Sequence, residues 1–125
     1  MDETEYCLWG LVNNAGLLLC PVDVELQSMS GYRRLMEVNF LSAVAVTQTF
    51  LPLIRRAKGR VVNISSMAGE VPMLSFSAYS STKAALSSFS RILRMEMLQW
   101  GVHVALIQPT GFKTSMDFHI TDTEK

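Results

Sequence analysis

Three short apolar runs, separated by two much longer stretches with helical periodicity, constrain most what this 125-residue chain can fold into. The runs cover 8–13, 60–65 and 102–107, and each has the length of a strand. Connections long enough to contain a helix join parallel neighbours in a sheet. The sequence therefore predicts an α/β fold, with a parallel sheet of about three strands and two long helices packed on it.

The first predicted helix lies between the first two runs. Apolar residues recur at helical spacing from Tyr32 to Phe50, and Ser30 is the predicted N-cap. Pro52 falls late in this helix and should bend it. Gly59 is the predicted terminator, because glycine favours the left-handed conformation in which helices end.

The second predicted helix covers 77–100 and is followed by Gly101, another residue suited to a helix end. The tail after Thr114 has no strong period, so we predict no element there.

The composition is apolar for a single small domain, with 49% hydrophobic and 18% charged residues. A small domain exposes a large share of its surface. We therefore expect strands that are covered on both faces, in a chain that is part of something larger. Eleven basic and eleven acidic residues give a net charge of zero, which argues against nucleic acid and against a polybasic membrane-binding surface.

The cysteines and the most apolar segment indicate no further site. Cys7 and Cys20 do not have the spacing of metal ligands, so no metal site is predicted, and both are expected to be small apolar fillers. The segment 40–54 is too short and too interrupted by polar residues and proline to predict a membrane span. The acidic residues after Met1 do not resemble a secretory signal.

Polar clusters follow all three predicted strands, at 13–16, at 65–66 and at 109–114. In open α/β sheets, ligands bind beyond the carboxyl ends of the strands. The sequence therefore predicts a site at that edge of the sheet.

Tyr79 and Lys83 are four residues apart in the second predicted helix, so their side chains lie on one face. A nearby ammonium favours the phenolate and should lower the pKa of the tyrosine, which makes the pair an acid/base candidate for an alcohol or a carbonyl. Taken alone, the pair is equally a half-buried tyrosine beside a solvated lysine.

Two further polar residues are candidates for the same site. The Ser66 hydroxyl can donate to a substrate oxygen on which charge develops, or it can simply stabilise a turn. Asn39 lies on the apolar stripe of the first predicted helix, where it is either a satisfied core amide or the anchor of a water molecule.

The ordered set of these residues resembles the short-chain dehydrogenase/reductase family, and in particular its retinol and steroid dehydrogenase branch. The resemblance extends from about Leu8 to Thr114. It is carried by these motifs: Asn13-Asn14-Ala15-Gly16, Asn39, Ser66, Tyr79-Ser80-Ser81-Thr82-Lys83 and Pro109-Thr110-Gly111-Phe112-Lys113-Thr114.

The resemblance implies a role for each residue. Tyr79 would be the general acid or base, Lys83 would lower its pKa and hold the nicotinamide ribose, Ser66 would bind the substrate oxygen, and Asn39 would hold a proton-relay water. The implied cofactor is NAD or NADP, with NAD slightly favoured. Its predicted contacts are Asn13, Ala15, Gly16, Tyr79, Lys83, Pro109, Gly111 and Thr114.

The resemblance also implies that residues 1–125 form a single incomplete dinucleotide-binding domain, a partial Rossmann-type fold. No Gly-x-Gly-x-x-Gly occurs among its seven glycines, so the N-terminal glycine-rich unit is expected to be missing. In a full-length relative, the two long helices would form a homodimer contact. Such a relative would reside in the endoplasmic reticulum membrane, by an anchor that this chain lacks.

Two hypotheses about function follow. The first is an NAD(P)-dependent oxidoreductase that interconverts a secondary alcohol and a ketone on a small apolar substrate, steroid-like or retinoid. The alternative is a truncated, catalytically inactive fragment that associates with full-length relatives through its two long helices.

Overall fold

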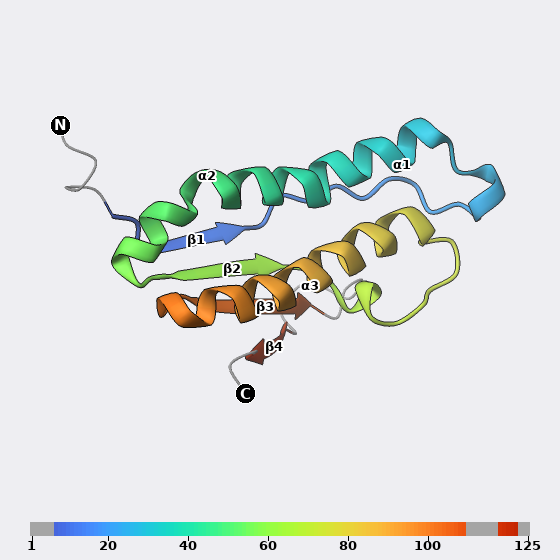
Figure 1. Ribbon diagram of the computed structural model, residues 1–125. Helices are drawn as coiled ribbons and strands as arrows, with labels where there is room; N and C mark the ends of the chain where they lie inside the picture. The colour runs from blue at the N-terminus through green and yellow to red at the C-terminus, as the bar shows by residue number, and fades with distance from the viewer. Residues whose placement is uncertain (1–6, 110–117, 123–125) are drawn as a thin grey trace.

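The computed structural model describes residues 7–109 and 118–122. Its sheet has four strands in the order β1 (Gly10–Asn13), β2 (Arg60–Ile64), β3 (His103–Pro109) and β4 (Phe118–Asp122). The first three are parallel, as predicted, with Asn13 beside Asn63 and Asn63 beside Leu106 (Figure 1).

β4 is an antiparallel edge strand that the sequence did not predict. It pairs with β3 through backbone hydrogen bonds, which need no particular side-chain pattern. The absence of a clear period after Thr114 therefore did not prevent a strand from forming.

The first predicted helix consists of three helical segments that follow one another without a break. They are α1 (Met29–Met36), a π-helical segment (Glu37–Leu41) and α2 (Ser42–Ala57). A π segment inside an α-helix is rare and often occurs at a functional site. Here it contains Asn39, the polar residue of the apolar stripe.

Both predicted ends of this helix are shifted by a residue or two. Ser28, not Ser30, is the N-cap, since its hydroxyl accepts a hydrogen bond from the Gly31 amide at 3.1 Å. Lys58, not Gly59, takes the left-handed conformation, with φ of 50°. Gly59 is needed for a different reason, because a Cβ there would lie 2.3 Å from the carbonyl oxygen of Trp9.

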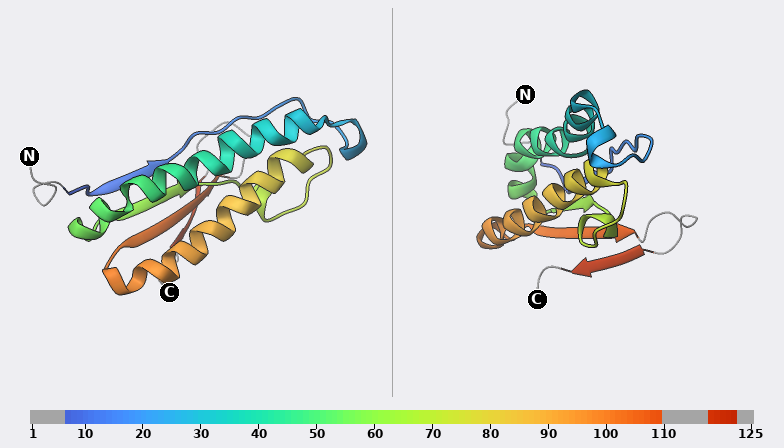
Figure 2. Two further views of the ribbon diagram at one scale, coloured as in Figure 1. Left: turned by 45° about the horizontal axis from the view of Figure 1, so that its top comes forward. Right: turned by 90° about the vertical axis from the view of Figure 1, so that its right-hand side faces the viewer.

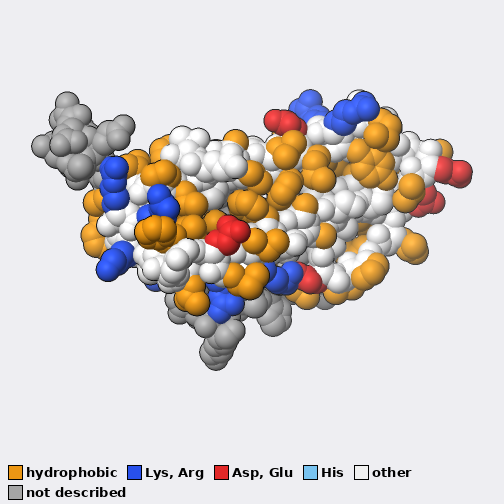
Figure 3. All heavy atoms as spheres, in the orientation of Figure 1, with side chains coloured by type: hydrophobic (Ala, Val, Ile, Leu, Met, Phe, Trp, Pro, Cys, Tyr) orange, Lys and Arg blue, Asp and Glu red, His pale blue; other side chains and the backbone are white. Residues whose placement is uncertain are grey.

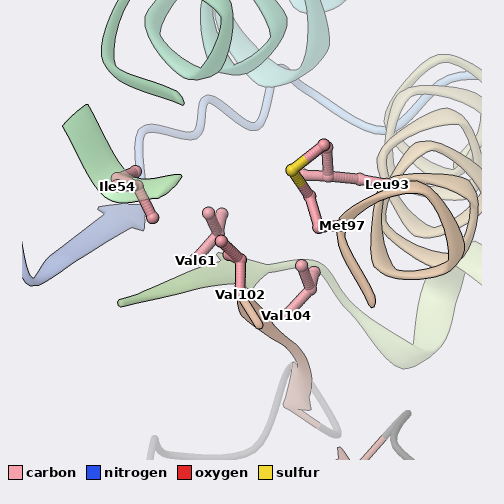
Figure 4. Packing of buried hydrophobic residues seen from close by; sticks show 6 residues of the cluster. All are labelled: Ile54, Val61, Leu93, Met97, Val102 and Val104. Carbon is pink, nitrogen blue, oxygen red and sulfur yellow. The ribbon is translucent and has the colours of Figure 1, made fainter. Parts of the chain in front are cut away.

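α3 (Ser77–Met97) continues into a short 3₁₀ turn (Leu98–Trp100), and Gly101 follows with φ of 70°, as predicted. α1, α2 and α3 lie on the same side of the sheet (Figure 2). The apolar faces of α2 and α3 meet the sheet in a core of six buried residues: Ile54, Val61, Leu93, Met97, Val102 and Val104 (Figure 4).

The expectation that both faces of the sheet are covered was wrong for the described residues. Along β2 and β3, fully buried positions alternate with partly exposed ones, as in a sheet covered on one side. Val12 in β1 is 62% exposed. Cys7 and Cys20 are also exposed and are not the core fillers that we expected.

The continuous helix from Met29 to Ala57 is long and apolar enough to cross a membrane, judged by length and composition alone, with a mean hydropathy of 1.3. The prediction from segment 40–54 considered a shorter stretch. In this fold the helix is one layer on the sheet, where it buries Leu35, Ala43 and Ile54.

Candidate active site

A cavity of about 300 Å³ lies at the carboxyl edge of the parallel sheet, where the sequence predicts a site. It brings together the ends of β2 and β3, the loop after β1 and the first turns of α3. Its lining residues are Asn14, Gly16, Leu17, Leu18, Ile64, Ser65, Ser66, Tyr79, Lys83 and Pro109.

Tyr79 and Lys83 line this cavity together, since the helical spacing puts them on one face of α3. The Lys83 ammonium lies 5.7 Å from the centre of the Tyr79 ring. The lysine is only 5% exposed, and its ammonium donates a hydrogen bond to the Ile64 carbonyl at 3.2 Å. Burial lowers the pKa of Lys83, because the charged form loses hydration.

The pKa of Tyr79 is raised, not lowered as the sequence led us to expect. Burial is the larger cause, because it disfavours the phenolate, and a hydrogen bond between the side chains of Tyr79 and Ser66 acts in the opposite direction. The prediction considered only the charge of Lys83. The ammonium instead lies over the phenol ring and is hydrogen-bonded to Ile64.

Ser66 caps a turn, which is one of the two roles that the sequence left open, and its donation to a substrate oxygen stays a prediction. Its hydroxyl accepts a hydrogen bond from the Ala68 amide at 3.1 Å and so caps a 3₁₀ turn (Met67–Gly69). The same side chain is buried at the cavity and interacts with Tyr79. The hydrogen bond from the Ala68 amide therefore holds the Ser66 hydroxyl in place beside the Tyr79 phenol.

Asn39 is a satisfied core amide. Its Oδ1 accepts from the Leu17 amide at 2.7 Å, and its Nδ2 donates to the Leu17 carbonyl at 3.0 Å and to the Thr82 hydroxyl at 3.1 Å. Leu17 lines the cavity, so Asn39 fixes one wall of the site. Its role in holding a relay water stays a prediction.

The structure does not bring Asn13 and Ala15 to the Tyr79 cavity. Both line a neighbouring cavity of about 240 Å³, against the π segment and α2. The Asn13 amide donates to Asn63 at 2.8 Å and to Thr47 at 3.1 Å, so it is engaged in the core.

Of the other predicted cofactor contacts, Gly16 and Pro109 line the Tyr79 cavity. Gly111 and Thr114 lie outside the described residues. Among 7–109 and 118–122, no three His, Cys, Asp or Glu residues gather as metal ligands would.

Asn14 and Ser65 also line the cavity, and both belong to the polar clusters that the sequence predicts at the site, although no role was assigned to them. Sequence reasoning missed three lining residues, Leu17, Leu18 and Ile64, since an apolar residue in a loop or strand looks the same whether or not it faces a cavity.

A phenol, a buried ammonium and a hydroxyl on one cavity can exchange a proton with a bound alcohol or carbonyl oxygen. On a parallel α/β sheet, this set defines a class of acid/base enzyme site. A family model described as short chain dehydrogenase matches residues 3–125, and the chain belongs to that family.

Curated relatives agree with the predicted branch. Estradiol 17-beta-dehydrogenase 2 of Mus musculus is 56% identical over 109 residues, which cover 87% of this chain and 29% of the relative. The mitochondrial D-beta-hydroxybutyrate dehydrogenase of Bos taurus is 50% identical over 112 residues, which cover 90% of this chain and 32% of that relative. The chain thus spans about a third of the length of these relatives.

Solved structures share the fold. A short-chain dehydrogenase from Streptomyces avermitilis superposes with a TM-score of 0.80 at 36% identity, over 88% of this chain and 40% of that one. The Pseudomonas aeruginosa RhlG/NADP active-site complex superposes with a TM-score of 0.76 at 36% identity, over 85% of this chain and 43% of that one. The predicted Rossmann-type α/β class is confirmed.

Proposed function

We propose that these residues form the catalytic part of an NAD(P)-dependent oxidoreductase that interconverts a secondary alcohol and a ketone. One observation carries the proposal: Tyr79, Lys83 and Ser66 share a cavity at the carboxyl edge of the sheet. Family membership supports the same chemistry.

In this proposal, Tyr79 is the acid/base group. Because burial raises its pKa, the phenol is protonated at neutral pH and is ready to donate its proton to a ketone oxygen. In the reverse direction the phenolate accepts the proton of the alcohol. The Ser66 hydroxyl donates to the same substrate oxygen and stabilises the charge that develops on it.

The residues present fit the nicotinamide end of a cofactor. Among the described residues, one of the three Lys83 donors is used, on Ile64, so the others can bind ribose hydroxyls. Gly16 lies beside that ammonium, since a Cβ there would be in ordinary contact with Nζ at 3.5 Å. When bound, a nicotinamide supplies or accepts the hydride. NAD is slightly favoured over NADP by the family resemblance.

The proposed substrate is a steroid-like alcohol. Support comes from relatives named for estradiol and for 11-beta-hydroxysteroids, and from the apolar residues Leu17 and Leu18 on the cavity. Retinoids are a second apolar class. The relative named for hydroxybutyrate suggests a smaller hydroxy acid instead. Turnover of estradiol and of hydroxybutyrate should therefore be compared.

The proposed assembly is a homodimer through α2 and α3. Hydrophobic side chains gather over these helices (Figure 3). The exposed hydrophobic residues of α2 and α3 include Phe50, Ile92 and Met95, at 39%, 49% and 65% exposed. The same surface supports the alternative function, in which the chain only associates with full-length relatives. By analogy with the steroid branch, we propose the endoplasmic reticulum membrane as the location of a full-length form.

A segment swap tests the proposal. The matching 109-residue segment of the mouse relative is replaced by that of this chain, and turnover is measured with estradiol, with hydroxybutyrate and with either cofactor. We expect a folded enzyme that oxidises estradiol in preference to hydroxybutyrate. A folded swap enzyme without turnover on either substrate would contradict the proposal.

The 125 residues alone, which contain no Gly-x-Gly-x-x-Gly, are expected to show little or no turnover. Native mass spectrometry of this chain mixed with the mouse relative tests the alternative. Mixed oligomers together with an inactive swap enzyme would favour association as the function.

A further inference from the structure

The loop that carries Ser66 is tied to two neighbouring elements by a single carboxylate. Glu70 ends the 3₁₀ turn that begins after Ser66. Its Oε1 accepts a hydrogen bond from Arg91 of α3 and a second one, at 2.9 Å, from the side-chain amide of Gln108 in β3. The loop runs beside α3 in Figure 1. One oxygen atom thus joins the Ser66 loop, the helix of Tyr79 and the strand that ends at Pro109.

The two bonds differ in their surroundings. The Arg91 and Glu70 side chains are 46% and 33% exposed, and an ion pair in contact with water contributes little. Gln108 is only 4% exposed, so water competes much less for its hydrogen bond with Glu70. The bond to Gln108 in β3, whose donor is buried, therefore adds a less exposed anchor for the carboxylate to the ion pair with Arg91.

Two further contacts fasten the loop on either side of Ser66. Before it, the Ser65 hydroxyl donates to the Lys83 carbonyl at 2.9 Å. After it, Gly69 lies against α3 so closely that a Cβ would be 2.8 Å from the carbonyl carbon of Lys83. Ser66 is held between these points against the turn of α3 that carries the site lysine.

We propose that Glu70 is a positioning residue, whose carboxylate bridge to Gln108 and Arg91 holds the Ser66 hydroxyl against Tyr79. The inference rests on the proposed function, which assigns the chemistry to that pair. Nothing in the sequence marked Glu70, because its partners are 21 and 38 residues away in the chain.

The test is the titration of Tyr79 in the full 125-residue chain, followed by NMR of ring-labelled tyrosine. The chain has three tyrosines, and Tyr79→Phe identifies the signal. Removing a negative charge near a phenol lowers its pKa, whereas losing a hydrogen bond that favours the phenolate raises it. A charge effect and a positioning effect therefore have opposite signs.

We expect Glu70→Ala to raise the pKa of Tyr79, by no more than Ser66→Ala does because the lost charge acts in the opposite direction, and the double variant should show no rise beyond that of Ser66→Ala. Glu70→Gln removes the charge but keeps an acceptor oxygen, so it should not raise the pKa of Tyr79. Glu96→Ala, which removes an exposed carboxylate elsewhere on α3, should not raise it.

A folded Glu70→Ala chain with an unchanged or lowered Tyr79 pKa would overturn the inference. If that variant does not fold, Gln108→Met removes the buried donor from the other side without changing charge, and an unchanged titration there overturns the inference equally. None of these readouts needs turnover. An inactive swap enzyme together with the expected titrations would refute the proposed function, whereas the positioning role of Glu70 would stand.

Discussion

Two groups of buried polar side chains lie between the sheet and its helices, and they differ in how fully they are paired. In the core, Asn13 bonds to Thr47 of α2 and to Asn63 of β2, and Asn63 bonds to Ser90 of α3 at 2.8 Å. At the cavity, Lys83 has three donors and, among the described residues, one hydrogen-bond acceptor. The core amides therefore hold strands and helices together, whereas the Lys83 ammonium can still donate hydrogen bonds to a ligand.

The difference also explains why a motif is an imperfect guide to chemistry. Asn13 and Gly16 belong to one four-residue motif, yet Asn13 pairs inside the core whereas Gly16 opens onto the cavity. Strand geometry is the cause, because Asn13 is the last residue of β1 and points to the helices. Variants of the two groups should therefore have opposite consequences for stability.

The largest change in stability is expected for Asn63→Leu. This fully buried side chain links β1 to α3, and its replacement removes one buried hydrogen bond from Asn13 and one from Ser90. Unfolding in urea should show a loss of about 2–3 kcal/mol. Thr49→Val is the matched control: its hydroxyl bond is exposed, and the change should be within about 0.5 kcal/mol. Equal losses in both variants would contradict the account.

A smaller effect of opposite sign is expected for Lys83→Met. Burial of an ammonium costs free energy, and no carboxylate within the part of the chain that the structure describes forms an ion pair with Lys83, so the variant should be at least as stable as the parent, by up to about 1 kcal/mol at pH 7. Because the unfolded chain binds the Lys83 proton more tightly, this difference should shrink as the pH rises toward 10.5. Urea midpoints across that range measure it, and a constant difference would contradict the burial effect.

The smallest effect is expected from Glu70 in acid. Arg91 is the main cause of its lowered pKa, so the stability it contributes is present above pH 4.5 and is lost as the pH falls through the lowered value. The pair is partly exposed, which limits the contribution to less than about 1 kcal/mol. Glu70→Gln should remove that part of the acid dependence, as measured by urea midpoints between pH 3 and pH 6.

Much of the fold was predictable because it follows from local patterns. Apolar runs gave the three parallel strands, and helical spacing placed Tyr79 beside Lys83. The π segment around Asn39, the edge strand β4 and the coverage of one sheet face were not predictable, because they depend on contacts between distant segments.

The same limit applies to the site. Position beyond the strand ends was enough to predict that Ser66 and Pro109 lie at one site, and Tyr79 reaches the same cavity from α3. The pKa of Tyr79 was predicted in the wrong direction, because burial, a tertiary property, raises it and outweighs the hydrogen bond to Ser66. The bridge made by Glu70 was missed for the same reason, since its partners are distant in sequence.

The most direct measurement is the turnover of the segment-swap enzyme carrying Tyr79→Phe. The account predicts a fall of about 10²–10⁴-fold in kcat at unchanged stability, since only the acid/base hydroxyl is lost. Tyr32→Phe is the control, because that hydroxyl only bonds to Ser77 at 2.6 Å, and kcat should be retained. Equal turnover in the two variants would show that Tyr79 is not the proton-transfer group.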